Sequence, residues 1–140
     1  MIISVCVVAY NEQKVLPDLL ECIKSQDYPH NQMEVVLIDS CSEDNTKKIM
    51  EKFREENKDF VNVQVLDNPR KIQAAGWNVA IKNYKGDAIL RVDAHAAIPK
   101  EFVRKNAEVL ESGEYVSGGV RPNMVDESTP WKETLLLAEQ

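Results

Sequence analysis

The chain has 140 residues, of which 44% are hydrophobic and 29% are charged, and its formal net charge at pH 7 is −6. This length fits one domain with a substantial core, and the composition is ordinary for a globular protein. No block of Lys and Arg stands out, so we expect no nucleic-acid partner. The three cysteines lack C-x-x-C spacing and predict reduced thiols.

Strand and helix patterns alternate along the first two thirds of the chain. Residues 2–9 and 35–38 are nearly continuous apolar runs, typical of parallel strands covered on both faces. Between them, residues 12–25 carry apolar side chains at helical spacing. Ser40 and Ser42 are each suitable N-caps for the helix that follows the second strand. These features predict an α/β fold.

The second half of the chain continues the alternation. Residues 61–65 alternate polar and apolar side chains, as expected of an edge strand. A helix over residues 72–84, a strand ending at Asp93 and a helix from Pro99 are predicted next. Residues 115–119 predict a fifth strand. The fold class is therefore α/β, with a central, mostly parallel sheet flanked by helices.

The last ten residues predict the start of an amphipathic helix that ends without a capping signal. We therefore expect the chain to be truncated at its C-terminus, with residues 1–120 forming one α/β domain and residues 121–140 belonging to a further region. The apolar stretch Leu135–Leu137 also predicts a homodimer.

No signal peptide or membrane span is visible, so we expect a cytoplasmic protein. Any membrane association would come through regions outside this chain.

Polar side chains follow each predicted strand. Parallel strands end at the same edge of a sheet, here called the carboxyl edge, where ligands bind in open α/β folds. We expect Asp39 and Asp93 to leave adjacent strands there. The candidate residues for this edge are Ala9, Tyr10, Glu12, Asp39, Arg70, Lys71, Asp93 and His95. An aromatic face, carboxylates and a basic pair near a helix start are the groups that a nucleotide diphosphate requires.

Each candidate also has a purely structural interpretation. Tyr10 could pack at a strand end, Asp39 could cap a helix, and Glu12 could be a first-turn carboxylate favoured by the helix dipole. Arg70 and Lys71 could be solvated loop cations. We interpret Trp77 as a core residue rather than as a platform for a sugar.

Five segments carry a resemblance to a known family. The segments are Val7–Glu12, Gln26–Pro29, Val36–Thr46, Gln73–Asn78 and Arg91–Ala96. In this order they resemble the P-x-Y-N-E, Q-x-Y-P, V-I-D-x-x-S-x-D-x-T, G-x-x-x-A-R-N and D-x-D motifs of the family-2 glycosyltransferases. The last segment is similar to the form found in the bacterial exopolysaccharide subgroup that includes succinoglycan synthesis.

The resemblance implies a GT-A (Rossmann-like) fold whose nucleotide-sugar-binding half comes first. It implies an inverting transfer from a nucleotide diphospho-sugar, with UDP expected as the nucleotide, to a glycan or lipid-linked acceptor. It assigns nucleotide binding to Ala9, Tyr10, Glu12, Asp39, Arg70, Lys71 and Asp93, and the metal, Mn²⁺ or Mg²⁺, to Asp93 and His95. The general base is expected outside this chain, so no catalytic residue is assigned.

Two departures from the family pattern affect the site. His95 stands where the family has its second aspartate, and Trp77 stands where it has the arginine of A-R-N. We therefore assign the phosphate contact to Arg70 or Lys71.

A module that binds a nucleotide-sugar or a partner without turnover is the alternative function. A nicotinamide dehydrogenase is disfavoured because no G-x-G-x-x-G follows the first strand. A nucleotidyltransferase is disfavoured because a Gly-rich, Arg-containing loop is missing at the same place.

Overall fold

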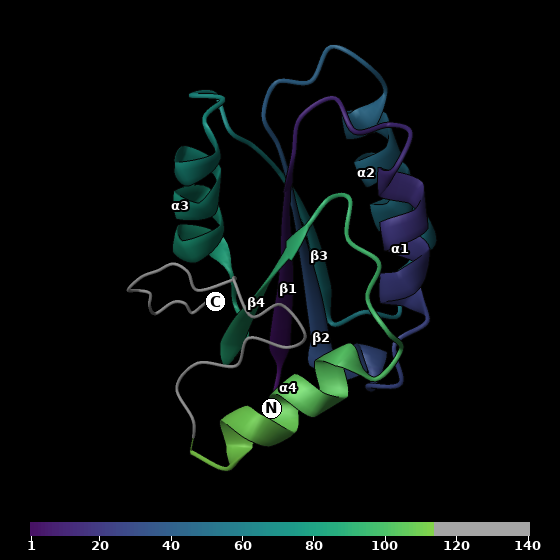
Figure 1. The fold of residues 1–140 in the computed structure, drawn as a ribbon, viewed down its shortest axis with the longest axis vertical. Coiled ribbons are helices and arrows are strands. Elements are labelled where there is room, and N and C mark those ends of the chain that lie inside the picture. Colours follow the sequence, from purple (N-terminus) through teal and green to yellow (C-terminus); the bar gives the residue numbers. More distant parts are fainter. Residues whose placement is uncertain (114–140) are drawn as a thin grey trace.

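The computed structural model describes residues 1–113, which form one parallel sheet with helices on both faces (Figure 1). The predicted strand over residues 115–119 and the C-terminal helix lie outside the described residues. The elements in chain order are β1 Ile3–Ala9, α1 Leu16–Lys24, a 3₁₀ turn His30–Gln32, β2 Met33–Asp39, α2 Thr46–Glu56, β3 Asn62–Asp67, α3 Gln73–Asn83, β4 Ala88–Asp93 and α4 Phe102–Glu111.

The strand order is β3-β2-β1-β4, and all three pairings are parallel. The chain adds β2 and β3 on one side of β1 and then returns to add β4 on the other side. The strand order therefore reverses between β1 and β4, which is the position where open α/β sheets bind ligands. The predicted edge strand is confirmed, because β3 has only one neighbour among the strands of residues 1–113.

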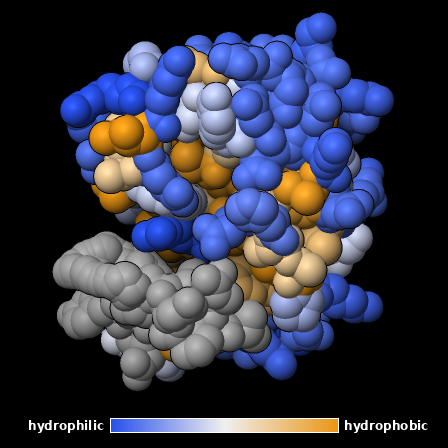
Figure 2. All heavy atoms as spheres, turned by 45° about the horizontal axis from the view of Figure 1, so that its top comes forward, coloured by the Kyte–Doolittle hydropathy of each residue, from blue (hydrophilic) through white to orange (hydrophobic). Residues whose placement is uncertain are grey.

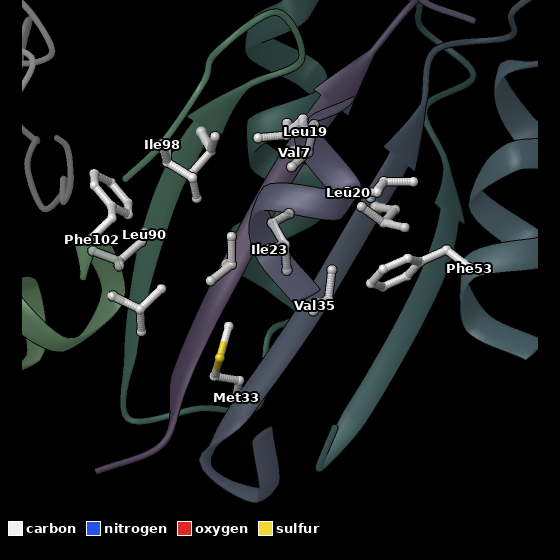
Figure 3. Close-up of a cluster of buried hydrophobic side chains, with 14 of the residues drawn as sticks. Val7, Leu19, Leu20, Ile23, Met33, Val35, Phe53, Leu90, Ile98 and Phe102 are labelled. Carbon is white, nitrogen blue, oxygen red and sulfur yellow. The ribbon is translucent and has the colours of Figure 1, made fainter. Parts of the chain in front are cut away.

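Side chains of alternate strand residues build two separate cores. The larger core lies under α1, α2 and α4 and contains Val7, Leu19, Val35, Phe53 and Phe102 (Figure 3). The smaller core lies under α3. Figure 1 shows α3 on one side of the sheet and α1 and α2 on the other. The continuous apolar runs of β1 and β2 follow from this arrangement, since both faces of these strands are covered.

One buried carboxylate interrupts the apolar strands. Glu34 of β2 is 1% exposed. Burial opposes its ionisation, but hydrogen bonds from the Lys85 N–H and from Ser4, Gln64 and Asn62 outweigh burial and lower the pKa of Glu34 below its usual value. The ionised side chain therefore links β1, β2, β3 and the turn before β4 at the end of the sheet opposite the carboxyl edge.

Two expectations about local structure are tested here. The cysteines at positions 6, 22 and 41 are all free thiols, as predicted. The N-cap prediction is wrong, because α2 begins at Thr46 rather than directly after Ser40 or Ser42.

Within residues 1–113, no helix combines the length and apolar character that crossing a membrane requires.

Candidate functional site

Tyr10 presents an exposed phenol ring at the carboxyl edge. It follows β1 directly, and 48% of its surface is exposed. The next residue, Asn11, has a φ of 51°, in the left-handed region that asparagine adopts more readily than most residues. Ala9, which precedes Tyr10, is buried, and its carbonyl accepts a 2.9 Å hydrogen bond from the Ser40 N–H. The turn thus leaves the Tyr10 side chain available to a ligand. Figure 2 tilts this edge forward and shows a mainly hydrophilic surface, with hydrophobic areas exposed among the hydrophilic ones.

The loops after β1 and β2 are joined by reciprocal hydrogen bonds. The Asn11 N–H donates to Ser42 Oγ, and the Glu43 N–H donates back to Asn11 Oδ1, both at 2.8 Å. The Glu12 N–H donates to Thr46 Oγ1, also at 2.8 Å. The positions of Tyr10 and Glu12 therefore depend on a neighbouring loop as well as on β1. The sequence predicted an N-cap role for Ser42 and did not predict these loop-to-loop contacts of Asn11, Ser42 and Thr46, although all three residues belong to the motifs quoted above.

Asp39 ends β2 and is 3% exposed. Its two carboxylate oxygens lie 3.2 and 3.4 Å from the Ser42 nitrogen, which donates to them. The N-cap of α2 is Asn45, which makes no side-chain capping hydrogen bond, and Asp44 Oδ1 before it accepts the Thr46 N–H at 2.9 Å. Asp39 therefore shapes the loop 40–42 and does not cap α2. An ionised carboxylate can accept several hydrogen bonds, so the single N–H of Ser42 does not use the full accepting capacity of Asp39.

Arg70 and Lys71 are exposed in the turn between β3 and α3. The turn is anchored by Asn68, which is fully buried and donates through Nδ2 to Ser40 Oγ at 3.0 Å and to the Ile72 carbonyl at 2.9 Å. Lys71 has a φ of 67°, in the left-handed region. Arg70 and Lys71 lie just before Ile72, the N-cap of α3, and the unpaired backbone N–H groups at a helix start favour anions. Sequence reasoning did not assign a role to Asn68.

Asp93 and His95 lie on the other side of β1 from Asp39. Asp93 ends β4 and pairs in register with Val8 of β1. The expectation that Asp39 and Asp93 leave adjacent strands is wrong, because β1 lies between β2 and β4. His95 Nε2 lies 3.0 Å from Glu12 Oε2, so this pair crosses from the β4 loop to the β1 loop at the strand reversal. Glu12 and His95 were predicted separately, and the fold brings them into contact.

The candidate metal ligands Asp93 and His95 would offer a carboxylate and an imidazole. Among residues 1–113, no three His, Cys, Asp or Glu side chains form a cluster suited to a metal ion. Asp93 and His95 are therefore at most two of its ligands. Mg²⁺ and similar cations are commonly held by one or two carboxylates together with substrate phosphates. This donor set fits a cation that binds jointly with a diphosphate.

Trp77 is a core residue, as predicted. It is 8% exposed and packs in the smaller core, while the Arg91 guanidinium lies 4.7 Å from the centre of its ring. A guanidinium over an indole at this distance is a favourable cation–π contact. Trp77 thus occupies the interior side of α3 and is not a surface platform at the carboxyl edge.

The sequence matches the family described as Glycosyl transferase family 2 over residues 4–138. A poly(ribitol-phosphate) beta-N-acetylglucosaminyltransferase, TarS, from Staphylococcus aureus is 36% identical over 108 residues, covering 77% of this chain and 18% of the relative. A dolichyl N-acetyl-alpha-D-glucosaminyl phosphate 3-beta-D-2,3-diacetamido-2,3-dideoxy-beta-D-glucuronosyltransferase from Methanococcus voltae is 29% identical, covering 78% of this chain and 34% of the relative.

Two solved structures have the same fold. The structure of S. aureus TarS residues 1–349 in complex with UDP-GlcNAc has a TM-score of 0.69 and 29% identity, and covers 93% of this chain and 40% of that one. The mannosyltransferase PcManGT from Pyrobaculum calidifontis, in complex with GDP-Man and Mn²⁺, has a TM-score of 0.76 and 28% identity, and covers 86% of this chain and 36% of that one.

The chain therefore spans well under half the length of these relatives. The parallel sheet, the helices on both faces and the two structural matches identify the fold as GT-A, as the sequence predicted. The chain belongs to glycosyl transferase family 2.

Proposed function

We propose that the protein transfers a sugar from a nucleotide diphospho-sugar, with UDP as the nucleotide, to a glycan or lipid-linked acceptor. The observation that carries this proposal is the grouping at the β1–β4 reversal: an exposed aromatic ring, Tyr10, beside side chains from the ends of both strands. Family membership and the UDP-GlcNAc complex of TarS support the donor class. This chain covers 18% of the TarS relative, so the substrates of the whole enzyme are part of the proposal.

Every candidate residue except Glu12 has a defined task in this proposal. Tyr10 stacks on the base beside Ala9, and the Asp39 carboxylate accepts hydrogen bonds from the base or ribose. Asp93 contacts the ribose and, with His95, holds Mn²⁺ or Mg²⁺. Such a cation, when bound, neutralises negative charge on the diphosphate leaving group.

Arg70 and Lys71, next to the start of α3, are proposed to contact the diphosphate. Their exposure leaves both side chains free to reach a ligand, and the N-terminus of α3 favours the same negative charge. Residues 1–120 form the donor-binding domain in this proposal, and residues 121–140 begin the acceptor-side region. An inverting transfer then requires a general base outside this chain to deprotonate the acceptor hydroxyl.

The acceptor that we propose is a growing exopolysaccharide or a lipid-linked glycan at the cytoplasmic face of the membrane. The Arg91–Ala96 motif supports the exopolysaccharide subgroup. A relative from Pseudomonas savastanoi, 29% identical over 125 residues, is an undecaprenyl-phosphate 4-deoxy-4-formamido-L-arabinose transferase, which supports a lipid-linked substrate. NMR of the anomeric configuration of the product would test inversion.

A binding module without turnover of its own is the second candidate. The observation that favours it is coverage, since the chain corresponds to 18% of the TarS relative. Donor binding without transfer by this chain, and transfer by a longer gene product, would support it.

Calorimetry with UDP-, GDP- and dTDP-sugars, with and without Mn²⁺, tests donor binding. We expect Asp93→Ala to remove the Mn²⁺-dependent part of UDP affinity, and Asp39→Ala to weaken UDP binding even without metal. Glu55→Gln, at the far end of α2 from the carboxyl edge, is the matched control. Unchanged affinities in both aspartate variants would contradict the assignment of the site.

A further inference from the structure

The contact between Glu12 and His95 joins two elements at the strand reversal. The Glu12 backbone is held on both sides, because its N–H donates to Thr46 Oγ1 and its carbonyl accepts from Val15 and Leu16 at the start of α1. Its side chain is 21% exposed, whereas that of His95 is 69% exposed. The anchored partner is therefore Glu12, and the side chain that it holds is His95.

The chemistry of the contact determines which ring nitrogen carries the proton. An ionised carboxylate can only accept hydrogen bonds, so His95 Nε2 is the donor in the 3.0 Å contact with Glu12. In a neutral imidazole the lone pair then lies on Nδ1. Within the described part of the chain, Nδ1 of His95 has no hydrogen-bond partner, and the ring is largely open to solvent. The free lone pair is thus accessible to a ligand.

We propose that Glu12 is a positioning residue for a metal-binding His95. It fixes the ring in the Nε2–H form and thereby leaves Nδ1, on the second residue after Asp93, to bind a divalent cation. Histidines that bind metals almost always donate their second ring N–H to a carboxylate, a carbonyl or water, and the Glu12 contact has this form. The inference rests on the proposed donor-binding function, and it removes Glu12 from the residues that touch the nucleotide.

The position of Asp93 is consistent with this role for His95. The two residues are separated only by Ala94, and the Ala96 N–H donates to the Asp93 carbonyl at 2.9 Å, which closes a tight turn after β4. An imidazole nitrogen beside a carboxylate suits Mn²⁺ better than a set of oxygen ligands alone. We therefore expect Mn²⁺ to bind more tightly than Mg²⁺.

The first test measures the tautomer of His95 without metal or nucleotide. Long-range ¹H–¹⁵N NMR at mildly alkaline pH distinguishes the two neutral forms of an imidazole. The chain has two histidines, and loss of one set of signals in His95→Ala assigns the spectrum. We expect the Nε2–H form in the native protein, its retention in Glu12→Gln, whose amide oxygen still accepts, and a mixture in Glu12→Ala. A predominant Nδ1–H form in the native protein would overturn the inference.

The second test measures Mn²⁺ affinity by the EPR signal of free Mn²⁺, in the presence of saturating UDP. Loss of a carboxylate that orients a metal-binding histidine typically costs about 10–100-fold in metal affinity, and we expect this range for Glu12→Ala. Glu12→Gln should retain most of the affinity. Glu43→Gln is the matched control, because Glu43 is exposed on the neighbouring loop and only its backbone N–H is hydrogen-bonded to the Glu12 turn. Equal Mn²⁺ affinity in Glu12→Ala and the native chain would refute the proposed role.

The two proposals fail in different ways. If the native chain does not bind UDP, the donor-binding function is wrong, whatever the tautomer of His95. If UDP binds without metal to the native chain but much more weakly to Glu12→Ala, Glu12 contacts the nucleotide and the positioning role is wrong. We expect equal metal-free UDP affinity in both proteins.

Discussion

Glu34 connects four parts of the structure, and we predict that Glu34→Gln destabilises the protein by about 2–3 kcal/mol at neutral pH. Oε1 accepts from Ser4 Oγ at 2.6 Å and the Lys85 N–H at 2.7 Å, and Oε2 accepts from Asn62 Nδ2 at 2.7 Å and Gln64 Nε2 at 2.8 Å. Glutamine replaces one oxygen by NH₂, and in either orientation this NH₂ faces two donors.

The magnitude follows from these two lost contacts. Hydrogen bonds to a charged group contribute roughly 1.5–3 kcal/mol each. Asn62 and Gln64 are half-buried, so they can turn toward water and recover part of the loss. A change of this size should lower the Tm by several degrees, because 1 kcal/mol corresponds to about 2–4 °C for chains of 150–250 residues and to more for shorter ones.

The effect of Glu34→Gln should depend on pH in a defined direction. Hydrogen bonds to the carboxylate outweigh burial and hold the pKa of Glu34 below its usual value in the folded protein. The ionised side chain therefore contributes stability above the unfolded pKa, about 4.3 for glutamate, and this contribution is lost as the pH falls through the folded pKa. Glutamine does not titrate, so the difference between native and variant proteins should shrink in acid.

Urea unfolding followed by circular dichroism at pH 7 and at a pH of about 3.5 measures both effects. Glu55→Gln, an exposed position on α2, is the control and should change stability little at either pH. A Glu34→Gln effect that is the same at both pH values, or smaller than about 0.5 kcal/mol at neutral pH, would refute this role of the buried carboxylate.

Three further predictions concern other parts of the chain. Gly76→Ala should cost about 1–3 kcal/mol in urea unfolding, because its Cβ would lie 2.6 Å from Val8 Cγ1; unchanged stability would contradict the close packing of α3 on β1. Tyr10→Ala should weaken UDP binding roughly tenfold in calorimetry while Tyr10→Phe retains it, since base stacking contributes about 1–3 kcal/mol; equal losses in both variants would exclude stacking. Leu136→Glu should reduce the self-association predicted from the apolar C-terminal stretch, and a native chain that sediments strictly as a monomer would contradict that prediction.

The order of elements and the residues of the core could be predicted from the sequence. The runs at residues 2–9 and 35–38 are too continuously apolar for strands with a wet face, so they had to be central strands. The alternation at residues 61–65 likewise predicted the edge position of β3. These patterns are reliable because burial acts on each residue of an element in a fixed period. The family motifs added the GT-A fold, which matters for function because it locates the site at the carboxyl edge.

Strand order and contacts between loops were decided only by the tertiary structure. Asp39 and Asp93 each end a strand, but no local pattern says which strands are neighbours, and β1 separates them. The start of α2 depends on Asp44 and on hydrogen bonds from the loop after β1, so local N-cap signals at Ser40 and Ser42 were misleading.

The Glu12–His95 contact and the Glu34 network have the same origin. The two residues of the contact are 83 positions apart in the sequence, and Glu34 meets Lys85 across 51 positions. A side chain's partner over such separations is determined by which strands pair and in which register, because register decides the neighbours of every residue on a face. Composition and periodicity describe each element by itself. The pairing of β1 with both β2 and β4 is what brings the groups of these two contacts together.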